Sequence, residues 1–271
     1  MSQKLREFQG QLIQAEKMVS VGTLVSGVAH ELNNPAGTIM LNAEFFSKAW
    51  KDIVPILDRV NTSKGDYEIA GLPFNESKEE INQLIPDLLN NAHRIKNIIE
   101  ELKEFSRKED SPVKQPMEIN KVIQASINLT NNMIKKATKN FSWESEEILP
   151  EISGSFQRLE QVFINLIQNA CQSLSDNTHG IYISTGYDNE KNEIIVKIKD
   201  EGEGIEEKDL KKITDPFFTT KRSNGGTGLG LSISFQIIKD HGGSINFESK
   251  KGKGTTVSVR LPITPLKEEK G

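Results

Sequence analysis

Apolar residues recur at alternating steps of three and four along two stretches of the first 106 residues, and this spacing predicts two long helices. The second stretch covers residues 81–105, and Gly65, Gly71 and Pro73 predict a turn between the helices over residues 61–75. Two helices alone cannot enclose so broad an apolar surface, so the pattern favours a helical hairpin that pairs with a second copy in a dimeric four-helix bundle. The first stripe consists of Met18, Val21, Val25, Val28 and Leu32.

The hydrophobic period changes after residue 116, where helical patterns alternate with short runs typical of strands. Helices are predicted over residues 118–137 and 155–175, and strands over 181–187, 193–199, 244–249 and 255–261. Strands mixed with helices, several of them joined as hairpins, indicate an α+β two-layer sandwich with helices on one face of the sheet. The predicted organisation is a helical domain at 1–108, a charged linker at 109–116, an α+β domain at 117–265 and a polar tail at 266–271.

Composition narrows the classes of protein that this sequence can represent. Its 34 basic and 38 acidic residues give a net charge of −4, which disfavours a nucleic-acid binder that works by neutralising phosphates. The single cysteine, Cys171, excludes an internal disulfide and suits a reducing compartment. Residues 1–18 lack the apolar core of a signal peptide, and no apolar run is long enough to span a bilayer. We therefore expect a cytoplasmic chain, with any membrane anchor outside this sequence.

A histidine with two polar neighbours lies in the first predicted helix, in the string VAHELNNPAG. When the apolar stripe takes the a and d heptad positions, His30 falls at f, which points away from the helix seam into solvent. Neutral imidazole has a lone pair for nucleophilic attack, and the adjacent Glu31 can accept the ring proton. Asn34 lies one turn further on the same face. An ordinary surface histidine gives the same local pattern, whereas a zinc protease does not, because the string is not HExxH.

Two asparagines four residues apart occur on the second predicted helix of the α+β domain. Asn165 and Asn169 share one face of this helix, and helix propensity does not explain amides there. Neutral amide oxygens suit a hard cation such as magnesium, which keeps several waters and bridges phosphates. The alternative is that one asparagine caps the helix or simply faces solvent.

A carboxylate followed by two glycines ends the predicted strand at 193–199. Asp200 is followed by Gly202 and Gly204, and these glycines let the backbone approach a flat ligand closely. The carboxylate can accept a hydrogen bond from an exocyclic amine of such a ligand. An ordinary hairpin turn has the same pattern.

A glycine-rich segment leads into a further predicted helix, whose free N–H groups and dipole favour phosphate. The segment is neither a Walker A loop nor a dinucleotide fingerprint, because it has no Gly-Lys-Ser/Thr and no GxGxxG after a strand. Upstream, Phe217 and Phe218 either pin the loop or pack in the core. Lys221 either meets phosphate or is solvated. The glycines of the segment are Gly225, Gly226, Gly228 and Gly230.

Five motifs, taken together and in this order, reveal a family resemblance. They are the H box GVAHELNNP, the N box NLIQNA, the G1 box DEGEG, the F box DPFFTTK and the G2 box GGTGLGLS. Over about residues 15–262 the chain resembles the kinase core of two-component sensor histidine kinases. The resemblance implies a dimerising helical hairpin followed by an ATP-binding domain with the GHKL (Bergerat) fold. It also implies a homodimeric kinase that uses ATP and Mg²⁺ and passes phosphate to an aspartate of a response-regulator receiver domain.

The resemblance assigns a role to each motif residue. His30 matches the phosphorylated histidine, Glu31 the acid that assists proton transfer, and Asn34 the residue that orients water to hydrolyse the partner's aspartyl phosphate. Asn169 matches the magnesium ligand, and Asp200 matches the adenine-binding aspartate. The other matches border the nucleotide or its phosphates: Asn165, Gly202, Gly204, Lys221, Gly226, Gly228, Gly230 and Thr255.

Three alternatives differ in what the motif residues do. A GHKL-type ATPase would hydrolyse ATP without a phosphohistidine, and it gives no reason for the HELNNP string. A regulator that acts mainly as a response-regulator phosphatase would depend on Asn34. A scaffold that dimerises without chemistry would have lost motif residues, and none is lost.

The remaining histidines and the cysteine are expected to be structural. His93 is expected on a helix surface, and His179 in a turn before a strand. His241 is expected at a helix C-terminus, where a cation is favoured. Cys171 is expected to be a small buried residue.

Overall fold

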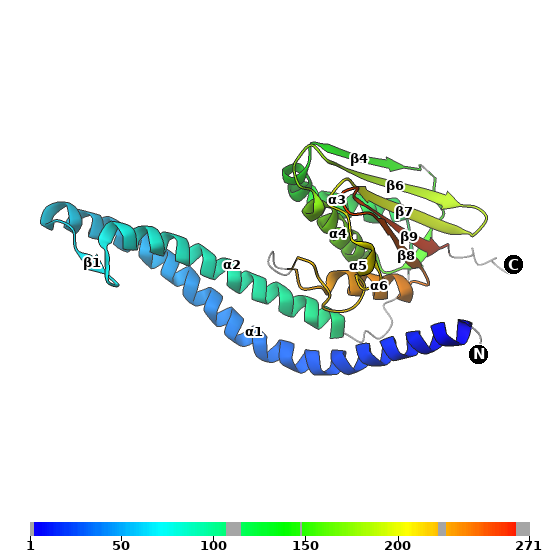
Figure 1. Cartoon of the computed structure of the whole chain (residues 1–271), viewed down its shortest axis with the longest axis horizontal. Helices are drawn as coiled ribbons and strands as arrows, with labels where there is room; N and C mark the ends of the chain where they lie inside the picture. The colour runs from blue at the N-terminus through cyan, green and yellow to red at the C-terminus, as the bar shows by residue number, and fades with distance from the viewer. Residues whose placement is uncertain (1–2, 107–114, 147, 222–225, 264–271) are drawn as a thin grey trace. The chain divides into compact units, whose positions relative to one another are not determined.

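The computed structural model of this chain divides into two compact units, Met1–Lys108 and Glu109–Gly271 (Figure 1). It describes residues 3–106, 115–146, 148–221 and 226–263, without the side chains of residues 3–31, 64, 102 and 104–106. The predicted solvent-facing position of His30, most of the linker at 109–116 and the tail at 266–271 lie outside the described residues.

The first unit is a helical hairpin, as the apolar stripes predict. Helix α1 (Gln3–Lys64) and helix α2 (Phe74–Ser106) lie side by side (Figure 1). Trp50 on α1 donates from Nε1 to Asn82 Oδ1 on α2 at 2.8 Å. Most of the buried apolar side chains are small and let the helices approach closely; among the described side chains of α1 and α2 they are Ala36, Ala43, Phe74, Ala92 and Ile99.

A short β-hairpin closes the tip of this helical hairpin, in the segment that the sequence predicts only as a turn. Strand β1 (Glu68–Ile69) pairs antiparallel with strand β2 (Leu72–Pro73). The Tyr67 ring stacks on Phe74 with a centroid distance of 5.0 Å, and its hydroxyl donates to the Leu57 carbonyl at 3.0 Å. Strands of two residues are too short to show an alternating pattern, which explains their absence from the prediction.

The second unit contains a five-stranded sheet with the strand order β4-β6-β7-β9-β8. Strand β4 pairs parallel with β6, and the other neighbours pair antiparallel. The four predicted strands are confirmed within one residue at each end. The strands are β4 (Asn140–Ser145), β6 (Gly180–Asp188), β7 (Glu193–Asp200), β8 (Ser244–Ser249) and β9 (Thr255–Pro262).

Three helices form the second layer of this unit, on one face of the sheet (Figure 1). They are α3 (Ile119–Ala137), α4 (Phe156–Ser173) and α6 (Gly230–Asp240), while α5 (Glu207–Leu210) is a single turn. The predicted α+β sandwich is therefore confirmed. No helix among the described residues is both long and apolar enough to cross a bilayer. The largest fully buried side chains of the described part of this unit include Ile123, Leu159, Phe163, Leu166, Ile167, Ile181, Ile183 and Ile194.

A second, two-stranded sheet was not predicted. Strand β3 (Gln115–Met117) pairs antiparallel with strand β5 (Ile152–Gly154). This pairing joins Gln115 and Pro116, which the sequence places in the linker, to the second unit.

His241 holds the end of α6 against the start of α4, and it does so as a neutral imidazole. Its Nδ1 donates to the Ile237 carbonyl at 2.7 Å, and its Nε2 accepts from the N–H of Ser155 at 3.0 Å. Because a backbone N–H can only donate, Nε2 carries no proton. The predicted position at a helix C-terminus is confirmed.

Candidate functional site

One face of α4 is polar along its C-terminal half. Asn165, Asn169 and Ser173 are four residues apart and therefore lie on the same side of the helix. Asn169 donates from Nδ2 to Asn165 Oδ1 at 3.5 Å, and Asn165 donates from Nδ2 to Ser234 Oγ on α6 at 2.9 Å. The two predicted asparagines are thus neighbours, and Asn165 links α4 to α6. Cys171 is buried, as predicted, and burial raises the pKa of its thiol to about 11.

The Asp200 carboxylate is buried at the end of β7, where only 6% of the residue is exposed. Its Oδ1 accepts from the Ser173 hydroxyl at 2.9 Å, the Gly202 N–H at 2.9 Å and the Thr255 N–H at 3.3 Å. No described residue donates to Oδ2. Burial raises the pKa of Asp200, and the three hydrogen bonds oppose this rise because they favour the ionised form. One carboxylate oxygen is therefore engaged with the protein, and the other is left as an acceptor.

Thr255 lies next to Asp200 because of the register between β7 and β9, in which these two residues are paired. Thr255 is buried, and its hydroxyl shares a 2.8 Å hydrogen bond with the Ser249 hydroxyl. Ser249 Oγ also accepts from the N–H of Ile205, in the loop that contains Gly204, at 2.8 Å. The fold thus gathers the predicted Asp200, its loop glycines and Thr255 at one end of the sheet.

Gly254 is required for this register, and its replacement is expected to destabilise the second unit strongly. Its φ is +79°, and a Cβ there would lie 2.0 Å from the Asp200 carbonyl oxygen, a backbone atom that cannot shift without breaking the β7–β9 pairing. We expect Gly254→Ala to lower the free energy of unfolding by at least about 3 kcal/mol, more than the left-handed conformation alone costs. Urea titration of the wild-type chain and of the Gly254→Ala variant measures this difference in the free energy of unfolding.

Gly252 provides the matched control for this prediction. Its φ is +76°, but a Cβ there meets nothing within 4 Å. Gly252→Ala is therefore expected to cost only about 1 kcal/mol, which is the penalty of the backbone conformation. Equal losses for the two alanine variants would show that the contact with Asp200 carries no energy.

The glycine-rich segment leads into α6, as predicted, with Gly230 as the first helical residue. Gly230 packs against the Asn165 amide, so the start of α6 lies beside the polar face of α4. At the base of the segment the Phe217 N–H donates to the Gly228 carbonyl at 3.0 Å. The Phe217 side chain is 42% exposed, which excludes core packing for this residue. Gly226 donates from its N–H to the Lys221 carbonyl at 3.1 Å.

Lys221 is half-buried on the same segment. Burial lowers the pKa of its ammonium group, and the carboxylates of Asp200 and Glu203 oppose this fall. Lys221 therefore interacts with the acidic groups around β7, and its predicted contact with phosphate stays a prediction.

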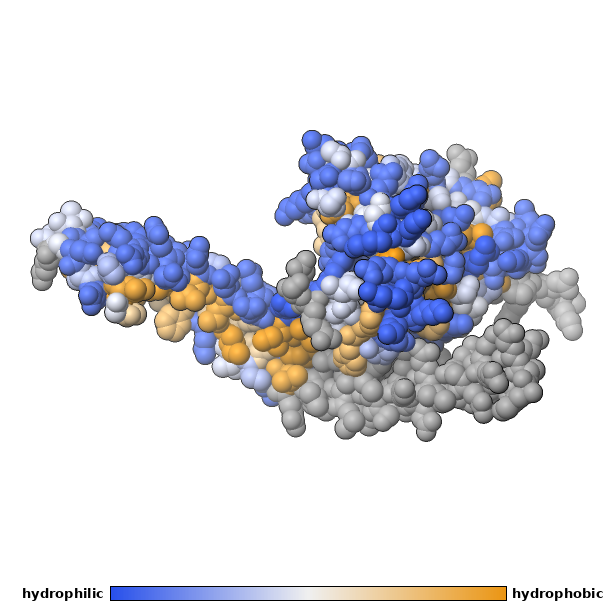
Figure 2. Space-filling model, viewed as in Figure 1, coloured by the Kyte–Doolittle hydropathy of each residue, from blue (hydrophilic) through white to orange (hydrophobic). Residues whose placement is uncertain are grey.

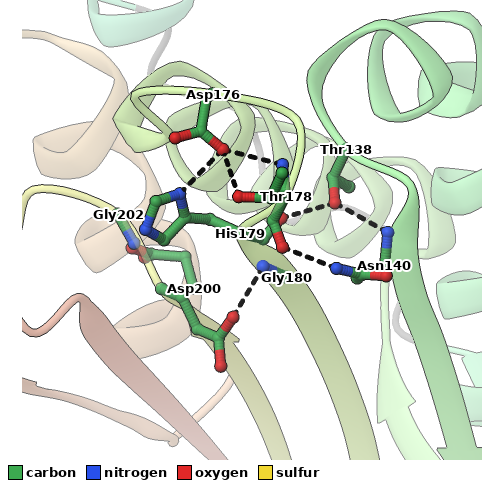
Figure 3. A network of polar contacts seen from close by, with 9 residues as sticks. Thr138, Asn140, Asp176, Thr178, His179, Gly180, Asp200 and Gly202 are labelled. Atoms are coloured by element: carbon green, nitrogen blue, oxygen red, sulfur yellow. Dashed lines mark hydrogen bonds and ion pairs between the residues drawn. The ribbon is translucent and has the colours of Figure 1, made fainter.

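The turn between α4 and β6 is tied to its surroundings by polar contacts (Figure 3). The Gly180 N–H donates to Glu201 Oε2 at 2.8 Å. Asp176 accepts from the Thr178 hydroxyl, which lowers the pKa of Asp176 to about 2, and its Oδ1 lies 3.1 Å from Nδ1 of His179. The predicted turn position of His179 is confirmed. These contacts hold the loop that precedes β6, the strand that pairs with β7.

The remaining predicted residues belong to the first unit. His30 and Glu31 lie within α1, and their side chains are outside the described residues. Asn34 has an exposed side chain, and its carbonyl accepts from the Thr38 hydroxyl at 3.0 Å. Helix α1 continues through Pro35.

The side chains of this site suit a metal ion that binds together with a phosphate-containing ligand. They suit a metal ion held by the protein alone less well. Among the described residues, no three His, Cys, Asp or Glu side chains gather into a metal-binding cluster. Oδ1 of Asn169 accepts no hydrogen bond within the described part of the chain, and only Nδ2 of this amide is engaged. A single neutral amide oxygen suits magnesium, which takes most of its other ligands from phosphates and water.

Sequence reasoning missed three serines that connect the predicted residues. Ser173 bonds Asp200, Ser234 bonds Asn165, and Ser249 bonds Thr255. Only Ser173 had a visible indication, because it continues the four-residue spacing of the two asparagines. The other two depend on which elements become neighbours in the fold.

Comparison with known protein families covers both units. Residues 20–111 match the His Kinase A (phospho-acceptor) domain. Residues 154–265 match the family described as histidine kinase-, DNA gyrase B- and HSP90-like ATPase.

Individual relatives point the same way. The signal transduction histidine-protein kinase AtoS of Escherichia coli (strain K12) is 34% identical over 260 residues, which are 96% of this chain and 38% of AtoS. The structure of histidine kinase ThkA in complex with the response regulator protein TrrA has a TM-score of 0.61 at 26% identity, covering 98% of this chain and 69% of that one. The ThkA catalytic domain alone is 32% identical with a TM-score of 0.50, covering 56% of this chain and 97% of that one.

The chain spans about a third to a half of the length of the curated relatives that it matches. Within that length it contains both a phospho-acceptor region and an ATPase-type domain, in this order. The chain therefore belongs to the sensor histidine kinases of two-component systems.

Proposed function

We propose that this chain transfers the γ-phosphoryl group of ATP to His30 and then to an aspartate of a response-regulator receiver domain. The observation that carries the proposal is the Asp200 carboxylate, buried with one oxygen engaged and the other left as an acceptor, in the same chain as a phospho-acceptor helix. AtoS is named a histidine-protein kinase, and ThkA is seen with a response regulator, which supports the same activity here.

The nucleotide would extend from Asp200 along the polar face of α4 to the start of α6. Oδ2 of Asp200 would accept from the exocyclic amine of adenine, while Gly202 and Gly204 let the loop beside the ring pack closely against Ser173 and the Lys250 carbonyl. The N–H groups of Gly230 and of the next residues in the first turn of α6 would meet the phosphates. Asn165 is in contact with Gly230 and would lie beside the phosphates. Thr255 would support the adenine end through its bond to Asp200.

Asn169 would hold magnesium through its free amide oxygen. When bound, the ion would supply positive charge that stabilises the negative charge of the phosphates. Lys221, Gly226 and Gly228 would border the phosphates from the glycine-rich segment.

In the proposed transfer the neutral imidazole of His30 attacks the γ-phosphorus in line with the bond to the β-phosphate. The new N–P bond forms as the P–O bond to the β-phosphate breaks, and ADP leaves. Glu31 accepts the proton that the imidazole loses. The receiver aspartate then attacks the phosphohistidine, and His30 is regenerated.

Asn34 supports a second activity, the hydrolysis of the receiver's aspartyl phosphate. Its side chain is exposed on α1, one turn after His30, where a docked receiver could meet it. A neutral amide at this place can orient a water molecule without attacking the phosphorus itself. Incubating a phosphorylated receiver domain with the chain tests this role, and an unchanged decay of the acyl phosphate would contradict it.

We further propose that the first unit forms a homodimer. Apolar side chains on α1 follow one another at seven-residue intervals with 36% to 67% of each exposed, and Figure 2 shows apolar residues gathered along one side of this hairpin. A second hairpin would bury this long, exposed apolar stripe in the core of a four-helix bundle. The residues of this stripe are Leu32, Ile39, Phe46, Ile53 and Val60.

Labelling with ATP tests the proposed kinase activity. Incubation with γ-labelled ATP is expected to label the chain with a phosphate that is stable to alkali and labile to acid, whereas α-labelled ATP leaves no label. Adding a receiver domain is expected to move the label to the receiver. Steady hydrolysis of ATP with no label on the chain would favour the GHKL-type ATPase instead.

A further inference from the structure

Ser173 joins the last turn of α4 to the loop after β7 through three separate contacts. Its hydroxyl lies 2.9 Å from Oδ1 of Asp200, and its carbonyl accepts from the Glu203 N–H at 2.9 Å. The third is the close approach of Gly202 to Ser173: a Cβ on this glycine would lie only 2.2 Å from the Ser173 hydroxyl oxygen. The serine hydroxyl is therefore enclosed between the helix and the loop that carries Asp200.

The hydroxyl of Ser173 has one proton and two acceptors within reach. The Ala170 carbonyl lies at 2.7 Å and the Asp200 carboxylate at 2.9 Å. An ionised carboxylate is the stronger acceptor, so the proton is directed at Asp200 while that group is charged. If the carboxylate were protonated, the Ala170 carbonyl would take this proton and the hydroxyl would no longer favour the charged form.

The bond from Ser173 determines what Asp200 can offer to a ligand. With Oδ1 occupied by three donors, the carboxylate cannot rotate without losing them, and Oδ2 can only accept. A purine with an exocyclic amine matches such an oxygen. A purine with a keto oxygen at the same position does not, because two acceptors would face each other. A protonated Asp200 would instead donate to the keto oxygen and erase the difference.

We infer that Ser173 is a positioning residue that keeps Asp200 an acceptor and so sets the preference for adenine over a keto purine. The inference rests on the proposed nucleotide site and adds the residue that gives this site its selectivity. Two of the three donors to Oδ1 are backbone N–H groups, so the Ser173 hydroxyl is the one donor that a substitution can remove without changing the backbone.

Binding of ADP and of inosine diphosphate to the whole chain tests this inference. The wild-type chain is expected to prefer ADP, and Ser173→Ala is expected to reduce the ratio of the two affinities by about tenfold, the effect of losing one hydrogen bond to a charged group. ADP affinity should account for most of the change. Ser173→Cys keeps the shape of the side chain, with a slightly larger atom in place of the hydroxyl oxygen and a much weaker donor, and it is expected to lose the same selectivity if the alanine variant does not fold.

Ser126 supplies the matched control, because it is another buried helical serine of the same unit. Its hydroxyl lies 2.9 Å from the Val122 carbonyl on α3 and 3.3 Å from the Glu160 carbonyl on α4, and neither contact involves Asp200. Ser126→Ala is expected to leave the ratio of affinities unchanged even if it lowers stability.

The possible results separate the inference from the proposed function. An equal loss of both affinities in the Ser173 variants would indicate a purely structural role, and two unchanged affinities would show that Ser173 does not position Asp200. Either result overturns the inference and leaves the nucleotide site intact. Failure of the wild-type chain to bind either nucleotide would instead contradict the proposed function, and the inference with it.

Discussion

A chain in which glutamine replaces His30 is expected to bind ATP normally but to acquire no acid-labile phosphate. Glutamine preserves the polarity of the side chain, but its amide nitrogen shares its lone pair with the carbonyl and cannot attack phosphorus. The label from γ-labelled ATP should therefore fall to background, and a fluorescent nucleotide should bind with unchanged affinity. The two measurements together distinguish loss of the acceptor from loss of the nucleotide.

His93→Gln is the matched control for this variant. His93 is an exposed histidine on α2 of the same unit, so its replacement changes the same chemical group in a similar setting. Labelling of the His93 variant is expected to equal that of the wild-type chain. Undiminished acid-labile labelling of the His30 variant would show that another residue accepts the phosphate.

Replacing Asp200 by asparagine is expected to weaken nucleotide binding by at least about a hundredfold and to abolish labelling. Oδ1 accepts from three donors, so an asparagine must turn its amide oxygen toward them. Its NH₂ group then occupies the place of Oδ2 and faces the adenine amine, donor against donor. The opposite rotamer would direct the NH₂ group at Ser173, Gly202 and Thr255, which is no better.

Glu201→Gln tests whether this effect is specific, because it makes the same change at the next residue. Glu201 accepts the Gly180 N–H on Oε2, and the amide oxygen of glutamine can keep that bond. Its nucleotide affinity is expected to stay within about twofold of the wild-type value. Binding that survives in the Asp200 variant would show that this carboxylate does not contact the base.

Hydrophobic periodicity predicted the elements of the fold wherever an element buries one complete face. Helix α4 and strand β7 are such cases, because their buried positions follow periods of 3.6 and 2. Strand β4 escaped prediction, and its burial explains why. None of its residues is fully buried, since β4 lies at the edge of the sheet and pairs only with β6. A strand with few buried residues shows little alternation of apolar and polar residues in its sequence.

In the site, too, some features could be predicted from local sequence patterns, whereas others depend on contacts between residues far apart in the chain. Asn165 and Asn169 could be assigned to one helix face from their spacing, and Asp200 could be assigned to a strand end. The pairing of Asp200 with Thr255 depends on the register of strands 55 residues apart in the chain, which no local pattern encodes. His241 shows the limit most clearly, because the hydrogen bond to its Nε2 comes from the N–H of Ser155, which precedes α4 and lies 86 residues away in the chain.

The polar face of α4 sets the distance and the relative orientation of the two ends of the proposed nucleotide site. Ser173 touches Asp200 at one end and Asn165 touches α6 at the other, and the eight helical steps between them span about 12 Å along the helix axis. Inserting or deleting a single residue between them would turn one end by about 100° relative to the other. Substitutions at positions of this segment that face neither the ligand nor the core can be tolerated, but a change in its length cannot, because the two ends would no longer face the same ligand.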